Sequence, residues 1–277
     1  MSVSPEHAEP ARVADLVRRL SEEPDPAWLV EHHKEVLGVI LACDRDGLRE
    51  MGARLAFAVW PVAGSVPDPE WWRELAGAGE ALAIAVRDPA MLVDLLDRSA
   101  RVFAAQGQRA DAEAQWVRAL AITRRPPGAE LRGRGVAILS ELGALYREWG
   151  RLGKALDAYL GLVDLRRAAG DPRETAEALA TVAATMYAAG RAGSAAGYFA
   201  QAADAMPEDT DDPLYPRILV WWGRVLWEQG ERGPARRRWS EALARVVDVD
   251  EELAEHVRAL LAAEADAPLP GGYPITG

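Results

Sequence analysis

The segment LSELGALYREWGRLGKALDAYLGL, residues 139–162, holds the pattern that decides the fold, and LATVAATMYAAGRAGSAAGYFAQA, residues 179–202, repeats it. In both segments a small residue stands five positions after a central glycine, and an aromatic residue stands nine positions after it. The glycines at the centre of this pattern are Gly107, Gly150, Gly190 and Gly230. Their separations of 43, 40 and 40 residues mark an internal repeat, which is the first feature to look for in a sequence.

Each position of the repeat has a physical role in a helix–turn–helix unit. The glycine suits the end of a first helix, where the backbone takes a left-handed conformation that other residues adopt at a cost. Small residues before and after it let two antiparallel helices approach closely. They are Ala100, Gly143, Ala183 and Gly223 before the glycine, and Ala112, Ala155, Ala195 and Ala235 after it. The aromatic residues are expected to fill the space between helix pairs. They are Trp116, Tyr159, Phe199 and Trp239.

Asp-Pro pairs predict where helices begin, because Asp is a good N-cap and Pro is favoured at the first helical position. The pairs begin at Asp25, Asp68, Asp88, Asp171 and Asp212. Glu174, three residues after Asp171, predicts a capping box there. No stretch shows the apolar–polar alternation of a strand.

These residues resemble the tetratricopeptide-repeat (TPR) family. The family's pattern of small, aromatic and glycine positions is matched by Leu139, Leu142, Gly143, Tyr146, Ala155 and Tyr159, and by Leu179, Ala183, Ala195, Phe199, Ala202 and Pro207. The resemblance implies an all-α fold, a right-handed α-α superhelix (TPR solenoid). The units here are about 40 residues long instead of the usual 34, and we expect residues 164–169 to lengthen a helix.

We expect four domain segments. Residues 1–87 form N-terminal helices and one degenerate repeat, 88–247 four TPR-like repeats, 248–266 a C-terminal capping helix, and 267–277 a flexible tail. Apolar stripes predict a short first helix around Val13 to Leu20 and a last one over residues 251–264. Long repeats of this kind resemble the C-terminal sensor regions of bacterial STAND and antibiotic-type regulators. Residues 27–31 and 55–61 are similar to the segment that joins such regions to their ATPase domain, and no phosphate-loop motif occurs here.

The composition limits the classes of partner. The net charge of −11 disfavours nucleic acid, which needs a positive surface. Neither a signal peptide nor a membrane-spanning apolar run is present, and the single cysteine, Cys43, fits a reducing compartment, so we expect a cytoplasmic protein without membrane contact. Cys43 is expected to be a buried thiol.

No motif predicts chemistry. Adjacent helical residues point about 100° apart, so His32 and His33 do not readily share a metal ion, and we expect no metal, no cofactor and no catalytic residue. Among the tryptophans, Trp222 is expected in the core, and at least one of the consecutive Trp71 and Trp72 is expected outside it.

By the resemblance, the first helices of the repeats line a concave groove that binds a partner. The groove positions are Asp94, Asp97 and Arg101, then Arg147 and Glu148, then Glu177 and Tyr187, and finally Arg217, Arg224, Trp227 and Glu228. Trp227 is a candidate contact residue, since exposed tryptophan is enriched at binding hot spots. The arginines suit a carboxylate or phosphate on the partner, because the guanidinium group binds such anions with two hydrogen bonds. The family's Lys/Asn/Arg carboxylate clamp is not reproduced, since the chain has no Asn.

The sequence therefore predicts a non-catalytic scaffold or regulatory protein that binds a protein or peptide in its groove. Two alternatives stay open: a small-ligand or peptide sensor module of a bacterial regulatory system, and an enzyme or biosynthetic accessory protein with a pocket in the helical scaffold. Self-association into a homo-oligomer stays open as well.

Overall fold

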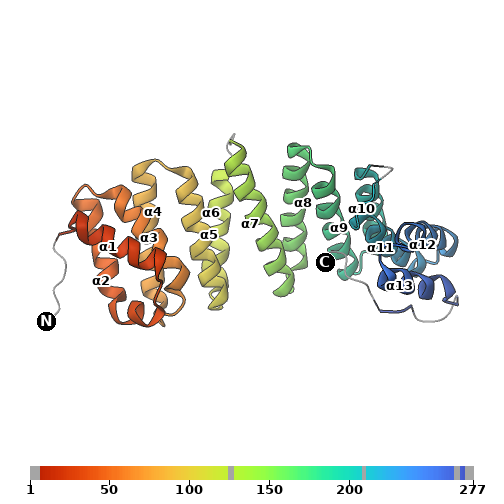
Figure 1. Ribbon diagram of the computed structural model, residues 1–277, viewed down its shortest axis with the longest axis horizontal. Helices are drawn as coiled ribbons and strands as arrows, with labels where there is room; N and C mark the ends of the chain where they lie inside the picture. Colours follow the sequence, from red (N-terminus) through yellow and green to blue (C-terminus); the bar gives the residue numbers. More distant parts are fainter. Residues whose placement is uncertain (1–6, 124–127, 208–209, 265–268, 272–277) are drawn as a thin grey trace. The chain divides into compact units, whose positions relative to one another are not determined.

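The structure, a computed structural model, describes residues 7–123, 128–207, 210–264 and 269–271. Within these ranges the chain forms thirteen helices and no strand (Figure 1). The helices are α1 (Pro10–Glu22), α2 (Pro26–Arg45), α3 (Arg49–Ala63), α4 (Pro69–Val86), α5 (Pro89–Ala105), α6 (Arg109–Thr123), α7 (Ala129–Glu148), α8 (Leu152–Ala169), α9 (Pro172–Ala188), α10 (Ala192–Ala205), α11 (Leu214–Glu228), α12 (Arg232–Val246) and α13 (Glu251–Ala262). The predicted all-α class is confirmed.

The chain divides into two compact units, Met1–Ile138 and Leu139–Gly277. In the N-terminal unit α3 packs against α1, α2, α4 and α5, and α5 packs against α6. The predicted short first helix, α1, buries Val13, Leu16 and Leu20. The division falls inside the predicted block of four repeats, and the predicted domain boundaries stay predictions.

In the C-terminal unit each helix from α8 to α13 packs against the next one along the chain. The helices α9 and α11, which are the first helices of two successive pairs, also contact one another. The last helix, α13, buries Leu253, Val257 and Leu260 against α12, as expected for a cap. Most of the predicted C-terminal tail lies outside the described residues.

The four repeat glycines end first helices as predicted. Their φ angles are positive, 74° at Gly107, 69° at Gly150, 73° at Gly190 and 84° at Gly230. Two hydrogen bonds close each turn: for the second glycine, Gly150 N donates to Arg147 O at 3.0 Å and Arg151 N donates to Tyr146 O at 2.8 Å. This is the Schellman pattern, which satisfies the last carbonyl groups of a helix. The sequence analysis missed a fifth copy, since Gly47, between α2 and α3, has φ 75° and the same bond from Leu48 N to Cys43 O.

Four of the five predicted Asp N-caps are confirmed. The carboxylates of Asp25, Asp68, Asp88 and Asp171 accept hydrogen bonds from backbone N–H groups in the first turns of α2, α4, α5 and α9. The fifth differs, because Pro213 itself is the N-cap of α11 while Asp212 accepts from Leu214 N at 2.9 Å. The capping box forms only on one side: Asp171 accepts from Glu174 N at 3.0 Å, whereas the Glu174 carboxylate pairs with Arg166 on α8.

Two of the repeat aromatics, Tyr159 and Trp239, pack on the first helix of their own pair, and the expectation that the aromatics fill the space between pairs stays a prediction. Trp239 on α12 donates from Nε1 to Val220 O on α11 at 3.1 Å. A β carbon at Gly223, also on α11, would lie 2.4 Å from that same Nε1. The small residue before the glycine is therefore small because the aromatic ring of the second helix lies on it.

Of two further expectations about buried residues, the one for Trp71 and Trp72 is corrected and the one for Cys43 is confirmed. Trp71 and Trp72 are both buried, each 3% exposed, because their indole N–H groups reach the carbonyls of His33 and Ala63 at 2.9 Å. The prediction that one of them leaves the core was wrong, since α4 packs against both α2 and α3. Cys43 is fully buried, as predicted, and burial, assisted by the charge of Asp46, raises the pKa of its thiol to about 11.

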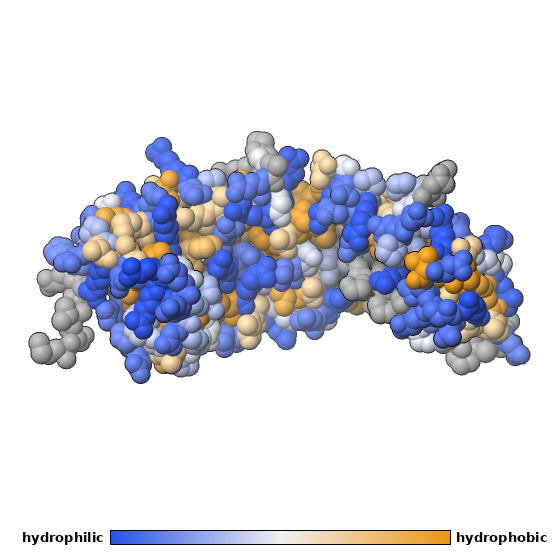
Figure 2. Space-filling model, in the orientation of Figure 1, coloured by the Kyte–Doolittle hydropathy of each residue, from blue (hydrophilic) through white to orange (hydrophobic). Residues whose placement is uncertain are grey.

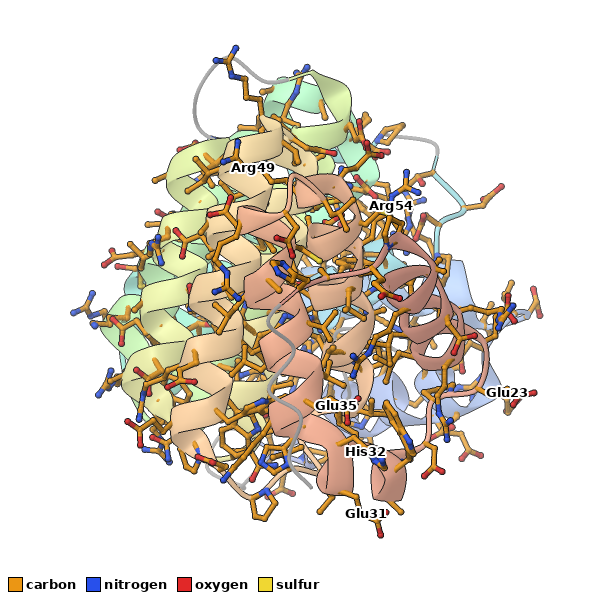
Figure 3. All side chains as sticks on the ribbon, turned by 90° about the vertical axis from the view of Figure 1, so that its left-hand side faces the viewer. Glu23, Glu31, His32, Glu35, Arg49 and Arg54 are labelled. Carbon is orange, nitrogen blue, oxygen red and sulfur yellow. The ribbon has the colours of Figure 1, made fainter. Side chains whose placement is uncertain are left out.

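His32 and His33 have separate surroundings. The His32 ring stacks on Trp28 with 4.5 Å between ring centroids, and the His33 ring meets Trp71 edge-on at 5.5 Å. Figure 3 shows His32 on α2 beside Glu31 and Glu35, with Arg49 and Arg54 at the other end of this part of the molecule. Over the described residues, no group of three or more His, Cys, Asp or Glu side chains is placed to hold a metal ion.

The surface is mixed in character. Figure 2 shows small apolar areas interleaved with charged and polar ones on the visible face. Scattered apolar residues of this kind are normal on a protein surface. None of the described helices is long and apolar enough to cross a membrane.

Candidate functional site

The C-terminal unit contains a pocket of about 540 Å³, called here the Tyr159 pocket. Four helices supply its walls. From α7 come Ser140, Ala144 and Arg147, from α8 Tyr159, Leu162 and Arg166, from α9 Glu174, Glu177, Ala178, Thr181 and Ala184, and from α11 Trp221. Two of the predicted groove residues, Arg147 and Glu177, are therefore brought together in one pocket.

Tyr159 is held in place by the repeat pattern. Its ring lies on Gly143 of α7, where an added β carbon would be 2.4 Å from Cε1 of the ring. The side chain is 3% exposed, and its hydroxyl has no hydrogen-bond partner among the described residues. Burial raises the pKa of this hydroxyl, and the nearby Arg147 charge opposes that shift. The ring is buried but the hydroxyl oxygen stays accessible to solvent, so it can hydrogen-bond with a ligand group that enters the pocket.

Most of the charges that line the Tyr159 pocket are paired. Arg166 on α8 pairs with Glu174 on α9. Glu177 pairs with Arg173 at 3.0 Å, and Arg173 also pairs with Asp212 at 2.9 Å. Arg147 is exposed and makes no ion pair with another described residue. The pocket therefore offers one cation, Arg147, to a ligand.

An aromatic wall closes one side of the Tyr159 pocket. Trp221 is half-buried, with its ring centroid 5.9 Å from that of Tyr187 on α9. The Tyr187 hydroxyl donates to Glu228 Oε1 at 2.6 Å, and Arg224 Nε lies 3.7 Å from the same carboxylate. Arg224 also stands 5.9 Å from the Trp221 ring and donates from Nη1 to Pro270 O at 2.6 Å. Three predicted groove residues, Tyr187, Arg224 and Glu228, thus form one cluster that supports Trp221.

The sequence analysis missed Trp221. It stands nine residues before Gly230, and Thr181, which stands nine before Gly190, also lines the pocket. Arg224 follows Trp221 by three residues, which places the two on neighbouring positions of one helix face. Trp221 lies on α11 between two predicted groove residues, Arg217 and Arg224, at a position that the groove assignment skipped.

Trp227 does not lie exposed on a groove, which corrects its assignment as a contact residue. Its side chain is 3% exposed, and its ring centroid is 5.3 Å from that of Trp239. The guanidinium groups of Arg232 and Arg236 lie over the ring at 4.1 and 5.6 Å. Arg147 and Tyr187, which like Trp227 stand three residues before a repeat glycine, are not buried. The larger apolar ring of Trp227 gains more free energy from burial, and it packs against α12.

Trp222 also differs from expectation. It is half-buried instead of being a core residue, and the guanidinium group of Arg238 lies 3.9 Å from its ring centroid.

The remaining predicted groove residues are placed as follows. In the N-terminal unit Asp94 accepts two hydrogen bonds from Arg134, at 2.6 and 2.8 Å, which link α5 to α7. Asp97 accepts from Trp116 Nε1 at 2.8 Å and from Arg101 Nε at 3.0 Å. These contacts tie Asp94 and Asp97 into the scaffold. In the C-terminal unit Glu148 is exposed and Arg217 is half-buried, and neither lines the Tyr159 pocket.

Comparison with known proteins informs the fold alone. No protein-family model and no curated protein matches this sequence. Among solved structures, aspartyl phosphate phosphatase F from Bacillus subtilis is similar with a TM-score of 0.50 and 15% identity, over 84% of this chain and 59% of that one. BtubC (BKLC) from P. vanneervenii has a TM-score of 0.48 and 16% identity over 96% of this chain and 97% of that one. The apo form of the quorum sensor NprR from B. thuringiensis has a TM-score of 0.42 and 10% identity over 91% and 80%.

Similarity at this level of identity carries no function. Together with the helix pairs and their glycine turns, the likeness to the phosphatase structure shows that this chain has a TPR-like helical repeat fold.

Proposed function

We propose that this chain is a non-catalytic regulatory scaffold that binds a segment of a partner protein, or a peptide, over the Tyr159 pocket. The observation that carries the proposal is the placement of Tyr159, whose ring is buried on Gly143 while its accessible hydroxyl faces a pocket of about 540 Å³ beside a half-buried tryptophan. Pockets that combine apolar walls with a few placed polar groups are the usual form of a binding site. Aromatic side chains such as Trp221 supply large contact areas at interfaces.

The non-catalytic part of the proposal rests on the residues that line the pocket. Its ionisable side chains are Arg147, Tyr159, Arg166, Glu174 and Glu177. Both glutamates are paired with arginines, so their carboxylates are already engaged within the scaffold. Ser140 lines the pocket, and none of the other lining residues is a histidine that could activate it as a nucleophile.

The cytoplasmic location and the likeness to sensor regions of bacterial regulators stay predictions. Binding of a small molecule in the same pocket is the alternative that the experiment below separates from a peptide.

The test is a selection from a displayed library of random twelve-residue peptides against the full chain, tagged at its N-terminus. We expect enriched peptides whose binding is weakened about tenfold or more by Trp221→Ala, as for a hot-spot tryptophan. Trp222→Ala is the matched control, because this neighbouring tryptophan is equally half-buried but does not line the pocket. No enrichment, or equal binding to wild type and Trp221→Ala, would reject the proposal.

A further inference from the structure

Two polar side chains of the Tyr159 pocket are accessible to a ligand, and their chemistry narrows the choice of ligand group. Arg147 brings a positive charge that no other described side chain pairs with, and Tyr159 brings an accessible hydroxyl that no other described residue binds. An arginine can only donate hydrogen bonds, while a tyrosine can donate one. The group that satisfies both at once is an acceptor with negative charge.

The number of charges favours a carboxylate over a phosphate. One guanidinium group balances one negative charge, and the other arginine that lines the pocket, Arg166, is engaged by Glu174. A phosphate group carries close to two negative charges at neutral pH. The second charge would lie near the carboxylates of Glu174 and Glu177 with no further cation to offset it.

The walls of the pocket favour a side chain over a chain terminus. Sites that capture a terminal carboxylate use exposed backbone N–H groups. The lining residues of the Tyr159 pocket all stand within helices, where backbone N–H groups beyond the first turn are bonded inside the helix. The one lining residue in a first turn, Glu174, donates its N–H to the Asp171 carboxylate. The donors available are therefore the side chains of Arg147 and Tyr159.

An apolar surface lies in the same pocket. The Trp221 ring contacts Tyr187 and Arg224, and Leu162 and Ala178 also line the pocket. A residue next to the acidic one in a bound segment can bury its side chain against this surface.

We infer that the Tyr159 pocket recognises an Asp or Glu side chain of the bound segment, which accepts from Arg147 and from the Tyr159 hydroxyl while an apolar neighbour packs on Trp221. This inference rests on the proposed function and names the chemistry of its partner. The chain's net charge of −11 does not oppose it at contact distance, because salt screens charges beyond about 8 Å at physiological ionic strength.

The experiment uses two displayed twelve-residue libraries that differ in one respect: the first contains Asp and Glu, and the second has Asn and Gln in their place. We expect enrichment from the first library, with an acidic residue beside an apolar one. The best peptide is then compared with its own Glu→Gln or Asp→Asn version, and with a version amidated at the C-terminus.

Protein variants identify the two donors. Arg147→Gln should weaken the acidic peptide about tenfold to a hundredfold, the size of a charge-assisted hydrogen bond, and should barely affect the neutral version. Tyr159→Phe, which keeps the ring on Gly143 and removes only the hydroxyl, should weaken the acidic peptide by about two- to tenfold. Arg237→Gln, an exposed arginine on α12 outside the pocket, is the matched control.

The outcomes separate the inference from the proposed function. If both libraries yield peptides that depend on Trp221 but not on Arg147, the carboxylate inference is overturned and the proposed function stands. If amidation of the C-terminus abolishes binding while Glu→Gln does not, the pocket binds a terminal carboxylate and the side-chain assignment is wrong. If neither library is enriched, both are overturned.

Discussion

The aromatic ring of Tyr159 lies directly on Gly143, so closely that a methyl group at Gly143 would stand 2.4 Å from Cε1 of the ring. This contact joins α7 to α8 and sets the position of the hydroxyl in the pocket. A glycine in a helix is usually unfavourable by about 0.5–1 kcal/mol relative to alanine, so its presence here reflects the space that the ring needs.

Gly143→Ala should therefore destabilise the protein. We expect a loss of about 1–3 kcal/mol in the free energy of unfolding, the usual cost of overpacking, measured by chemical denaturation. Gly197→Ala on α10 is the matched control, since a β carbon there meets no atom within 4 Å. The control should gain about 0.5–1 kcal/mol from better helix propensity. Equal effects at the two positions would contradict the packing described for Tyr159.

Trp227→Ala should act on stability rather than on binding. The ring packs on Trp239 beneath two arginines, so its removal leaves a cavity at the α11–α12 contact. We expect a loss of about 3–5 kcal/mol in the free energy of unfolding, as for other buried aromatic residues. Trp227→Phe should lose clearly less, because it retains most of the apolar contact. A stable Trp227→Ala protein with weakened peptide binding would restore the original assignment of Trp227 as a contact residue.

Acid should weaken the C-terminal unit through His256. Burial, assisted by the charge of Arg224, lowers the pKa of this histidine below its usual 6.5. The folded state thus disfavours the protonated form. The corresponding stability is fully present above the unfolded-state pKa of about 6.5 and is lost as the pH falls toward the folded-state pKa. Melting temperature should fall between pH 7.5 and pH 5, and His256→Gln should reduce that fall.

Cys43 should resist thiol reagents while the protein is folded. Only the thiolate reacts, and burial raises the pKa of this thiol to about 11. Titration with a disulfide reagent at pH 8 should find almost no reactive thiol in the native protein and one per chain in denaturant. Because the folded-state pKa is raised, the stability linked to this group is present below the unfolded-state pKa of about 8.5 and is lost as the pH rises toward 11. Rapid modification of the native protein would mean that the α2–α3 contact opens readily.

The repeat could be predicted because each unit meets the same local requirement. The positive φ at Gly107, Gly150, Gly190 and Gly230 and the Asp caps depend on backbone geometry within a few residues, so the sequence displays them directly. The placement of large side chains depends on neighbouring helices. Trp227 shares its repeat position with Arg147 and Tyr187, yet its ring turns onto α12 because Trp239, Arg232 and Arg236 are there to cover it.

The candidate site could be predicted only in part for the same reason. Arg147 and Glu177 were found because they hold groove positions of the repeat. Tyr159 was recognised only as a packing residue, since nothing in the sequence shows that its hydroxyl lacks a partner. Trp221 was missed because the groove positions were carried over from the family, and no family position pointed to it.

The hydrogen bond from Arg224 to Pro270 has a practical consequence for handling the protein. Gly277 follows Pro270 by seven positions in the sequence, and an extended chain of that length spans at most about 25 Å. An affinity tag or a surface attachment at the C-terminus would therefore be anchored close to Trp221 and the Tyr159 pocket. A sensor chip or resin loaded through that end would crowd the surface that binds, whereas attachment through the residues before α1 leaves the C-terminal segment in its native sequence.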